Sequence, residues 1–506
     1  MSFTSPGFLL FLLILFPLYF ICPKRMQWGL LLAASYLFYV LSAPGALVYL
    51  MATTLVTFAA GLLLDRVDKK MKTPILAAAL VLLFGLLFVM KYWGFAAGAM
   101  EKVFSWLGVS VALPQLNLLL PLGLSFYIFQ SVGYLMDVSR QKIPPDRNPL
   151  RLALFVSFFP QIIQGPIGRY DRLSVSLFAG HSFDATQLKY GIQLMLWGAF
   201  KKLVIADRVA ALVDAVFRDH TSHGGAVIFT GVVFYCLQIY CDFSGGIDIA
   251  RGVAQGLGIQ MDENFRRPYF ADSMAGFWRR WHITLGSWMR DYLFYPIILS
   301  RPFGKLGKFL RRKYGRDAAK VIPSSLATFI VFVIIGLWHG ASFKFIAFGL
   351  YNGVLITASA LMEPAFKRWK DRLGIGPDNK AWRVFGVART FLLLSIGRYF
   401  SRAATFKTAM RMLETTVTAP RLSELTGAAM AKLGLPIADL VIVLGSVAIL
   451  FAVSLFQERG RELRKSLEQK SFMVQWGVMA AAIVLILLFG VYRGDYVAQQ
   501  FIYAQF

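Results

Sequence analysis

The stretch FWRRWHITLGSWMRDY, residues 277–292, holds three tryptophans, three arginines, one histidine and one aspartate in a mostly apolar chain. Its histidine, His282, is one of five, and another, His339, follows a tryptophan in GLWHGA. A neutral imidazole can take a proton from an attacking hydroxyl near neutral pH. We therefore predict that His339 and His282 serve one reaction site, with His339 as the base.

Each histidine also has a structural interpretation. His339 can be a packing residue that bonds a neighbouring carbonyl, and His282 can belong to a tryptophan-rich anchor at the bilayer interface. An ionisable group deep in a bilayer is costly, however, and by default indicates function. If the segment around His282 is helical, Trp278 and Gly286 share its face, whereas Trp281 lies on another.

Other side chains are candidates to line a substrate channel, and they are Trp338, Trp281, Asp242, Ser244, Gln164 and Asn352. Ser244-Gly245-Gly246 predicts a break in its helix. The neighbouring Asp242 then fixes the tautomer of a histidine, receives a cation or caps the broken helix. The sequence has no Walker loop, no GxSxG elbow and no clustered metal-ligand spacing, so we predict no bound metal and no bound cofactor.

The elements that must position these side chains are membrane helices. Of 506 residues, 57% are hydrophobic and only 16% are charged, which is too little charge to cover a soluble protein of this length. Apolar runs such as 75–90 and 439–456 approach the roughly 20 residues that cross a bilayer. We predict an all-α polytopic membrane protein with about 10–12 transmembrane and re-entrant helices.

Composition divides this single membrane domain, residues 1–506, into three zones. Residues 1–115 are nearly continuous apolar helices that suit a scaffold, and residues 356–506 are simple apolar segments with basic linkers. Residues 116–355 are interrupted by glycine, proline and polar groups, for example at Gly165-Pro166. Irregular backbone is tolerated at membrane depth only around protein or a water-filled cavity, so we predict a catalytic core here.

The net charge is +26, from 53 basic and 27 acidic residues. Basic loops at 65–72 and 139–147 alternate as the positive-inside rule expects, which places them in the cytoplasm. The stretch 300–320 carries eight basic residues and one acidic residue, and it predicts a cytoplasmic amphipathic connector that is either solvated or lies at the lipid headgroups. If the next helix begins at Pro323, His339 lies about 24 Å along it.

The partners that this charge favours are membrane lipid and an acidic cytoplasmic acyl-carrier protein. Nucleic acid is not an expected partner, because the charges are scattered between apolar segments and form no folded basic domain.

The middle zone resembles the bacterial branch of the membrane-bound O-acyltransferase (MBOAT) superfamily. The resembling blocks, in family order, are PLGLSFYIFQSVGYLMDV (121–138), FFPQIIQGPIGRY (158–170), QIYCDFSGGIDIARG (238–252), ENFRRPYF (263–270), FWRRWHITLGSWMRDY (277–292) and GLWHGASFKFIAFGLYNG (336–353). RYFSRAATFKTAM (398–410) and FIYAQF (501–506) also look family-like. The branch includes alginate-type polysaccharide O-acetylation proteins and D-alanyl transferases of teichoic acid.

The resemblance implies a ring of helices around a central funnel. In it His339 matches the family's catalytic histidine, and His282 matches the second histidine of this branch. With the nearby tryptophans, His282 would then orient or support the acyl group. The resemblance also implies a cytoplasmic thioester donor, either acetyl-CoA or an acyl-carrier thioester, and an acceptor on the outer side. In similar proteins the immediate acceptor is often a separate extracytoplasmic protein, here expected to be an SGNH-type acyltransferase. We expect a multi-pass enzyme of a bacterial inner membrane that acts in O-acetylation of exopolysaccharide or cell wall.

Other functions remain open. D-alanyl transfer to teichoic acid is one, although the long basic connector and the long chain after His339 favour polysaccharide O-acetylation. A proton-coupled transporter with broken helices around a midplane site is an alternative of another class. A haem held by two histidines is a weaker one. A transporter predicts inverted internal repeats, and none is apparent in the sequence.

Overall fold

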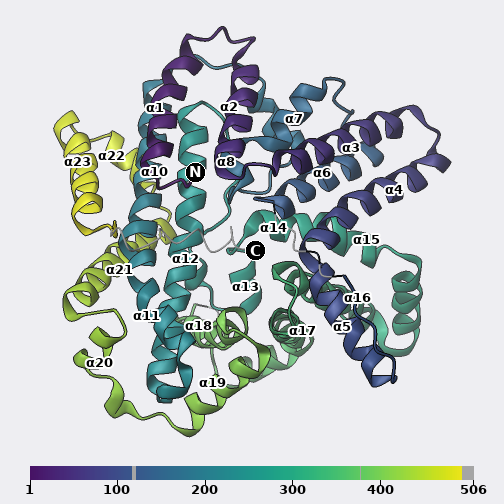
Figure 1. The fold of residues 1–506 in the computed structure, drawn as a ribbon. Coiled ribbons are helices and arrows are strands. Elements are labelled where there is room, and N and C mark those ends of the chain that lie inside the picture. The colour runs from purple at the N-terminus through teal and green to yellow at the C-terminus, as the bar shows by residue number, and fades with distance from the viewer. Residues whose placement is uncertain (115, 117–120, 377, 493–506) are drawn as a thin grey trace. The chain divides into compact units, whose positions relative to one another are not determined.

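The computed structural model describes residues 1–114, 116, 121–376 and 378–492 (Figure 1). The family-like FIYAQF, 501–506, lies outside the described residues. Within them the regular structure is helical, and the one β contact is an isolated antiparallel bridge between Phe265 and Trp281. The predicted all-α class is confirmed.

Seven segments among the described residues are long and apolar enough to cross a membrane. They are Leu47–Arg66, Lys69–Trp106, Gly225–Gly256, Arg301–His339, Phe343–Arg372, Ile437–Glu458 and Phe472–Phe489. Two shorter apolar helices, Pro6–Ile21 (α1) and Gln27–Ser42 (α2), precede them. These segments confirm the polytopic class. The prediction of about 10–12 membrane helices also counted tilted and re-entrant helices, which the seven long segments do not include, and that number stays a prediction.

The chain packs into two compact units, each built from segments that are distant in the sequence. Unit 1 comprises Met1–Val204, Cys241–Asp262 and Arg464–Phe506. Besides α1 and α2, its described elements are Leu47–Arg66 (α3), Lys69–Leu87 (α4), Phe88–Tyr92 (η1), Trp93–Trp106 (α5), Leu124–Ser139 (α6), Pro149–Ser157 (α7), Phe159–Ile162 (α8), Tyr170–Leu177 (α9), Ala185–Ala199 (α10), most of Phe200–Ala206 (η2), the second half of Gly225–Gly256 (α12), most of Leu463–Glu468 (α22) and Phe472–Phe489 (α23). The three zones were defined by composition rather than by contacts, and they stay a prediction.

Helix starts in unit 1 follow from local capping. Ser5 and Asn148 each place a side-chain oxygen on backbone N–H groups of the next turn, and Pro6 and Pro149 occupy the first helical positions. Asp184 caps α10 in the same way, at 2.8 Å from the N–H of Thr186. A capping oxygen accepts from an N–H group that has no acceptor within the helix. Proline has no N–H group, so at the first helical position it costs the helix no hydrogen bond.

The predicted helix break at Ser244-Gly245-Gly246 is wrong, because α12 continues through it. Gly245 serves close packing instead: a Cβ there would lie 2.8 Å from the carbonyl oxygen of Gly198 in α10. Small residues let two membrane helices approach backbone to backbone. The interruption expected at Gly165-Pro166 is confirmed, since residues 163–169 after α8 are not helical.

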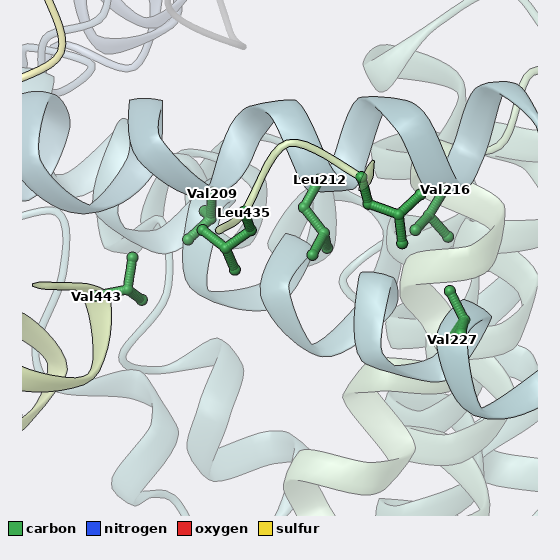
Figure 2. Close-up of a cluster of buried hydrophobic side chains, with 7 residues drawn as sticks. Val209, Leu212, Val216, Val227, Leu435 and Val443 are labelled. Carbon is green, nitrogen blue, oxygen red and sulfur yellow. The ribbon is translucent and has the colours of Figure 1, made fainter. Parts of the chain in front are cut away.

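Unit 2 comprises Ile205–Tyr240 and Glu263–Leu463. Besides the first half of α12, its elements are Asp207–Arg218 (α11), His220–Ser222 (η3), Pro268–Phe270 (η4), Met274–Trp278 (α13), Ile283–Met289 (α14), Arg290–Phe294 (η5), Tyr295–Ile298 (α15), Arg301–His339 (α16), Phe343–Arg372 (α17), Lys380–Arg402 (α18), Phe406–Thr418 (α19), Leu422–Glu424 (η6), Gly427–Lys432 (α20) and Ile437–Glu458 (α21). Figure 2 shows one of its apolar cores, formed by Val209, Leu212, Val216, Val227, Leu433, Leu435 and Val443.

Helix α16 contains a sharp corner at Gly315, whose φ of +89° lies in the region that suits glycine. The basic stretch predicted as an amphipathic connector is therefore helical from Arg301 onward, on both sides of a corner, and its place near lipid headgroups or in solvent stays a prediction. Pro323 lies inside α16, so the prediction that the helix begins there is wrong. Both residues lie in the helical part after the corner, so the separation of about 24 Å along the axis holds, and the depth of His339 in a membrane stays a prediction. His339 is the last residue of α16.

Two glycines let the end of α16 pack against α17. A Cβ on Gly336 would lie 2.4 Å from the carbonyl oxygen of Phe345, and a Cβ on Gly349 would lie 2.6 Å from that of Phe332. Neither position accepts a methyl group unless the backbone moves. This contact sets the spacing of the two helices next to His339.

We expect Gly336→Ala to lower the free energy of unfolding by about 1–3 kcal/mol, because its methyl group forces α16 and α17 apart. Gly304→Ala in the same helix is the matched control, since nothing lies within 4 Å of a Cβ there and alanine favours a helix. Unfolding in mixed lipid–detergent micelles measures both variants. Equal stability of the two would contradict the glycine contact.

Candidate active site

His339 lies in an aromatic cage at the end of α16. It is 8% exposed, and Gly340 after it adopts an extended backbone that ends the helix. The His339 ring centroid is 5.0 Å from that of Trp338 and 5.6 Å from that of Phe348 in α17. Phe345 stacks nearby at 6.3 Å. Backbone ends of two helices and three aromatic rings therefore hold this imidazole.

His282 has a different backbone from the one that a helical segment would give it. Residues 277–292 are not one helix, because α13 ends at Trp278 and α14 begins at Ile283. Between them His282 adopts φ 48° and ψ 52°, the left-handed region, at a cost of about 1–3 kcal/mol for a residue with a Cβ. The face that it was predicted to share with Trp278 and Gly286 is therefore wrong.

Asn264 imposes this conformation on His282. Its Oδ1 accepts from the backbone N–H of Thr284 at 3.0 Å and from the Thr284 hydroxyl at 2.8 Å, and it lies 3.2 Å from Nδ1 of His282. Its carbonyl oxygen accepts from the N–H of Ile283 at 3.0 Å. Because Oδ1 is an acceptor, the neutral imidazole carries its hydrogen on Nδ1 and its lone pair on Nε2. Asn264 stands in the family-like ENFRRPYF block, and no role was predicted for it.

Trp338 joins the two histidines. Its ring centroid is 6.0 Å from that of His282 and 5.0 Å from that of His339. All three side chains are buried within unit 2. The structure therefore brings together the two histidines that were predicted to share a site, and their chemical roles stay a prediction.

Burial, and secondly the nearby His339 ring, lower the pKa of His282 well below 6.5. Stability should therefore fall as the pH is lowered below about 6.5, since the unfolded chain takes up a proton there that the folded chain does not. We expect the stability advantage over His282→Gln to shrink by about 1.4 kcal/mol per pH unit in this window. Below the lowered pKa the difference becomes constant.

Unfolding titrations between about pH 8 and pH 5 measure this difference. His223→Gln, in the loop before α12, is the control because it removes an imidazole elsewhere in unit 2. A difference between the native protein and His282→Gln that does not change with pH would show that folding leaves the titration of His282 unaltered.

Trp281 forms a platform beside His282. It is 2% exposed, and its ring centroid lies 4.9 Å from that of Phe265 and 5.3 Å from that of Phe277. The guanidinium of Arg398 in α18, 4% exposed, lies 5.0 Å from the Trp281 ring centroid. A buried cation on an aromatic face fixes the position of both groups. Arg398 stands in the quoted RYFSRAATFKTAM block, and no role was predicted for it.

Asn352 in α17 is buried at the same end of unit 2. Its Oδ1 accepts from Nε1 of Trp278 at 3.3 Å, and its Nδ2 donates to the carbonyl oxygen of Phe348 at 2.8 Å. Both ends of its amide are therefore used inside the protein. These hydrogen bonds favour a role for Asn352 in positioning Trp278 and Phe348 over direct contact with substrate. Its predicted place in the channel stays a prediction.

The remaining predicted channel residues belong to unit 1 rather than to unit 2. Asp242 forms a 2.6 Å ion pair with Lys202, and Ser244 accepts from Lys201 at 2.8 Å. Lys201 also pairs with Asp248 at 2.7 Å. A buried charge is stable only when it is paired and hydrogen-bonded, so these contacts suit a structural role.

The π-helical turn η2, Phe200–Ala206, explains why Lys201 and Lys202 both reach α12. No role was predicted for either lysine, although two adjacent cations in an apolar stretch are a signal that the sequence contains. Gln164 lies in the non-helical segment 163–169 and is fully buried. Its side-chain amide has no hydrogen-bond partner within the described residues, and its predicted role as a channel residue stays a prediction.

The many apolar spans and the buried pair of imidazoles define a membrane-embedded protein whose site suits proton transfer. The chain belongs to the membrane-bound O-acyltransferase family, whose model matches residues 31–312. This range includes His282 and ends before His339. The protein is therefore a multi-pass membrane O-acyltransferase, and the resemblance to this family is confirmed.

Several curated proteins are similar to the chain. The probable alginate O-acetylase AlgI of Pseudomonas putida is 31% identical over 96% of this chain and 96% of its own length. The peptidoglycan O-acetyltransferase of Helicobacter pylori is 30% identical over 59% and 57% of the two chains. The teichoic acid D-alanyltransferase of Bacillus subtilis is 28% identical over 58% and 71%. The predicted bacterial branch is confirmed, and the transporter and haem alternatives have no comparable support.

Proposed function

We propose that the protein moves an acyl group, most readily acetyl, from a cytoplasmic thioester to a hydroxyl on the outer side of a bacterial inner membrane. The observation that carries this proposal is the contact of Trp338 with the rings of both His282 and His339. The donor is acetyl-CoA or an acyl-carrier thioester. The acceptor is a cell-surface polysaccharide or an SGNH-type partner that carries the acyl group onward.

His339 acts as the general base in this proposal. Its imidazole takes the proton of the attacking hydroxyl while the hydroxyl oxygen adds to the thioester carbonyl carbon. The carbon–sulfur bond then breaks, and the proton passes to the departing thiolate. His282, with its hydrogen held on Nδ1 by Asn264, directs Nε2 as an acceptor that orients the incoming hydroxyl.

O-acetylation is favoured over D-alanyl transfer. The alignment with the alginate O-acetylase of P. putida covers 96% of this chain, and that with the D-alanyltransferase of B. subtilis covers 58%. The matching core handles the acyl group in either reaction. D-alanyl transfer to teichoic acid therefore remains the second candidate.

Proteoliposomes that contain the protein in one orientation test the proposal. Labelled acetyl-CoA, an acetylated carrier protein or a D-alanylated carrier protein is supplied on the side of the basic loops, with a hydroxyl acceptor on the other side. We expect acetyl label on the acceptor, and none when the donor is supplied on the acceptor side. Preferential transfer of D-alanine would replace the acetyl assignment. No transfer from any thioester would refute the proposed donor class.

A further inference from the structure

A pocket of about 250 Å³ lies beside the histidine segment of unit 2. It is lined by Phe270, Ala271, Asp272, Gly276, Arg279, Arg280 and Arg383. Pockets for whole ligands usually measure about 300–1,000 Å³, so this one suits a single charged group rather than an entire cofactor. Three guanidiniums line it, and they stay charged at every physiological pH. A small anion is therefore the ligand that the lining favours.

Glu458, at the end of α21, holds one wall of this pocket in place. Its carboxylate accepts from both terminal nitrogens of Arg280, at 3.1 and 3.0 Å, and from Nε of Arg267 at 2.8 Å. A two-point contact of this kind fixes the plane of the guanidinium as well as its position. Arg280 is thus a fixed part of the wall.

Arg279 and Arg383 are the arginines that a ligand can engage. Arg279 forms no ion pair with any residue that the structure describes. Arg383 lies 3.7 Å from Glu458, which is beyond hydrogen-bond distance, and its side chain is 64% exposed. Four guanidiniums here meet two carboxylates, a surplus of two positive charges, counting Arg267, Arg279, Arg280 and Arg383 against Asp272 and Glu458.

The pocket is connected to the histidine site by two elements. Arg280 is two residues before His282 in the same segment. Helix α18 carries Arg383 at the pocket and Arg398 on the Trp281 platform, and these two positions are about 22 Å apart along the helix axis. One rigid helix therefore fixes the distance from the anion pocket to the platform beside His282.

The basic ends of nearby helices indicate on which side of the membrane the pocket opens. Helix α17 ends in KRWKDR, 367–372, and Lys380 begins α18 only a few residues before Arg383. After Glu458 the chain continues into RGRELRK, 459–465. By the positive-inside rule these ends face the cytoplasm, the side of the proposed donor.

We propose that this pocket binds a phosphate group of the acyl donor, which is joined to its thioester by a long flexible arm. The inference rests on the proposed function. An arm of about thirteen bonds between phosphorus and sulfur, as in phosphopantetheine, extends on the order of 15 Å. Arg280 lines the pocket and stands two residues before His282, which is at most about 7 Å along the backbone, so an arm of this length can reach from the pocket to the histidines. An acyl phosphate holds its acyl group next to the phosphate and would leave it in the pocket.

Ligand binding to the purified full-length protein in lipid nanodiscs tests this inference without turnover. We expect 4′-phosphopantetheine to bind at least about tenfold more tightly than pantetheine, which lacks the phosphate. Arg279→Gln/Arg383→Gln should weaken phosphopantetheine binding by about 10- to 100-fold and leave pantetheine binding unchanged. Arg372→Gln is the control, because it removes an exposed arginine at the basic end of α17 that does not line the pocket. If the double variant does not fold, Arg279→Gln alone makes the same comparison.

Coenzyme A distinguishes the two sources of such a phosphate. Tighter binding of coenzyme A than of phosphopantetheine supports a nucleotide donor, and equal binding supports a carrier-protein donor. Equal affinities for phosphopantetheine and pantetheine would overturn the inference, and so would an equal loss in Arg372→Gln. Because binding is measured without transfer, either result is separate from success or failure of the acyl-transfer assay.

Discussion

A protein with His339→Ala is expected to transfer acyl groups about 10²–10⁴-fold more slowly than the native protein while staying folded. In the proposed mechanism the imidazole removes the proton of the attacking hydroxyl, and α16 carries no other histidine. Alanine keeps the helix end, because the aromatic rings and the α16–α17 contact hold this segment. The loss should appear in kcat rather than in the apparent affinity for donor.

The acyl-transfer assay in proteoliposomes measures this effect, with thermal unfolding as the check on folding. His223→Ala is the matched control, since it removes a histidine from a loop of unit 2 outside the aromatic cage. Native-like transfer by a folded His339→Ala protein would contradict the role of base. A rise in the KM for donor with unchanged kcat would instead assign His339 to donor binding.

The parts of the fold that sequence could predict are those set by local composition. Long apolar runs predicted membrane helices, since crossing a bilayer demands length and hydrophobicity from one continuous segment. His282 and His339 were recognised because ionisable side chains are rare in such surroundings. Their common contact with Trp338 brings together two histidines that are 57 positions apart in the chain. Only the chemistry of the two imidazoles indicated from the sequence that they lie close together.

The parts that sequence could not predict depend on contacts between distant segments. The left-handed backbone of His282 is imposed by Asn264, which lies 18 residues earlier in the chain. The spacing of residues on a helix face carries no information about such a distant contact. Gly245 was interpreted as a helix breaker, although glycine permits close packing of helices as well as helix breaks. Only the contact with Gly198, in another helix, shows that its role is close packing. The ion pair of Asp242 could not be predicted because its partner, Lys202, lies 40 residues earlier.

Lys202→Met is expected to cost about 3–5 kcal/mol of unfolding free energy, more than any other single change considered for stability. Lys202 and Asp242 are 1% and 3% exposed and lie 2.6 Å apart. Removing the lysine takes this ion-pair partner from the buried carboxylate, and the attraction that offset its desolvation is weakened. Unfolding titrations in lipid–detergent micelles measure the effect. Lys189→Met is the control, because its half-exposed pair with Glu468 should contribute only about 0–1 kcal/mol.

The double variant Lys202→Met/Asp242→Leu separates structure from chemistry. Two apolar side chains of similar size replace a buried pair at little cost, so we expect most of the lost stability to return. A double variant as unstable as Lys202→Met would show that the lysine acts through other partners. A double variant that is stable but inactive in acyl transfer would return Asp242 to the reaction path, where the sequence first placed it. Stable and active protein would make the pair a structural link between η2 and α12.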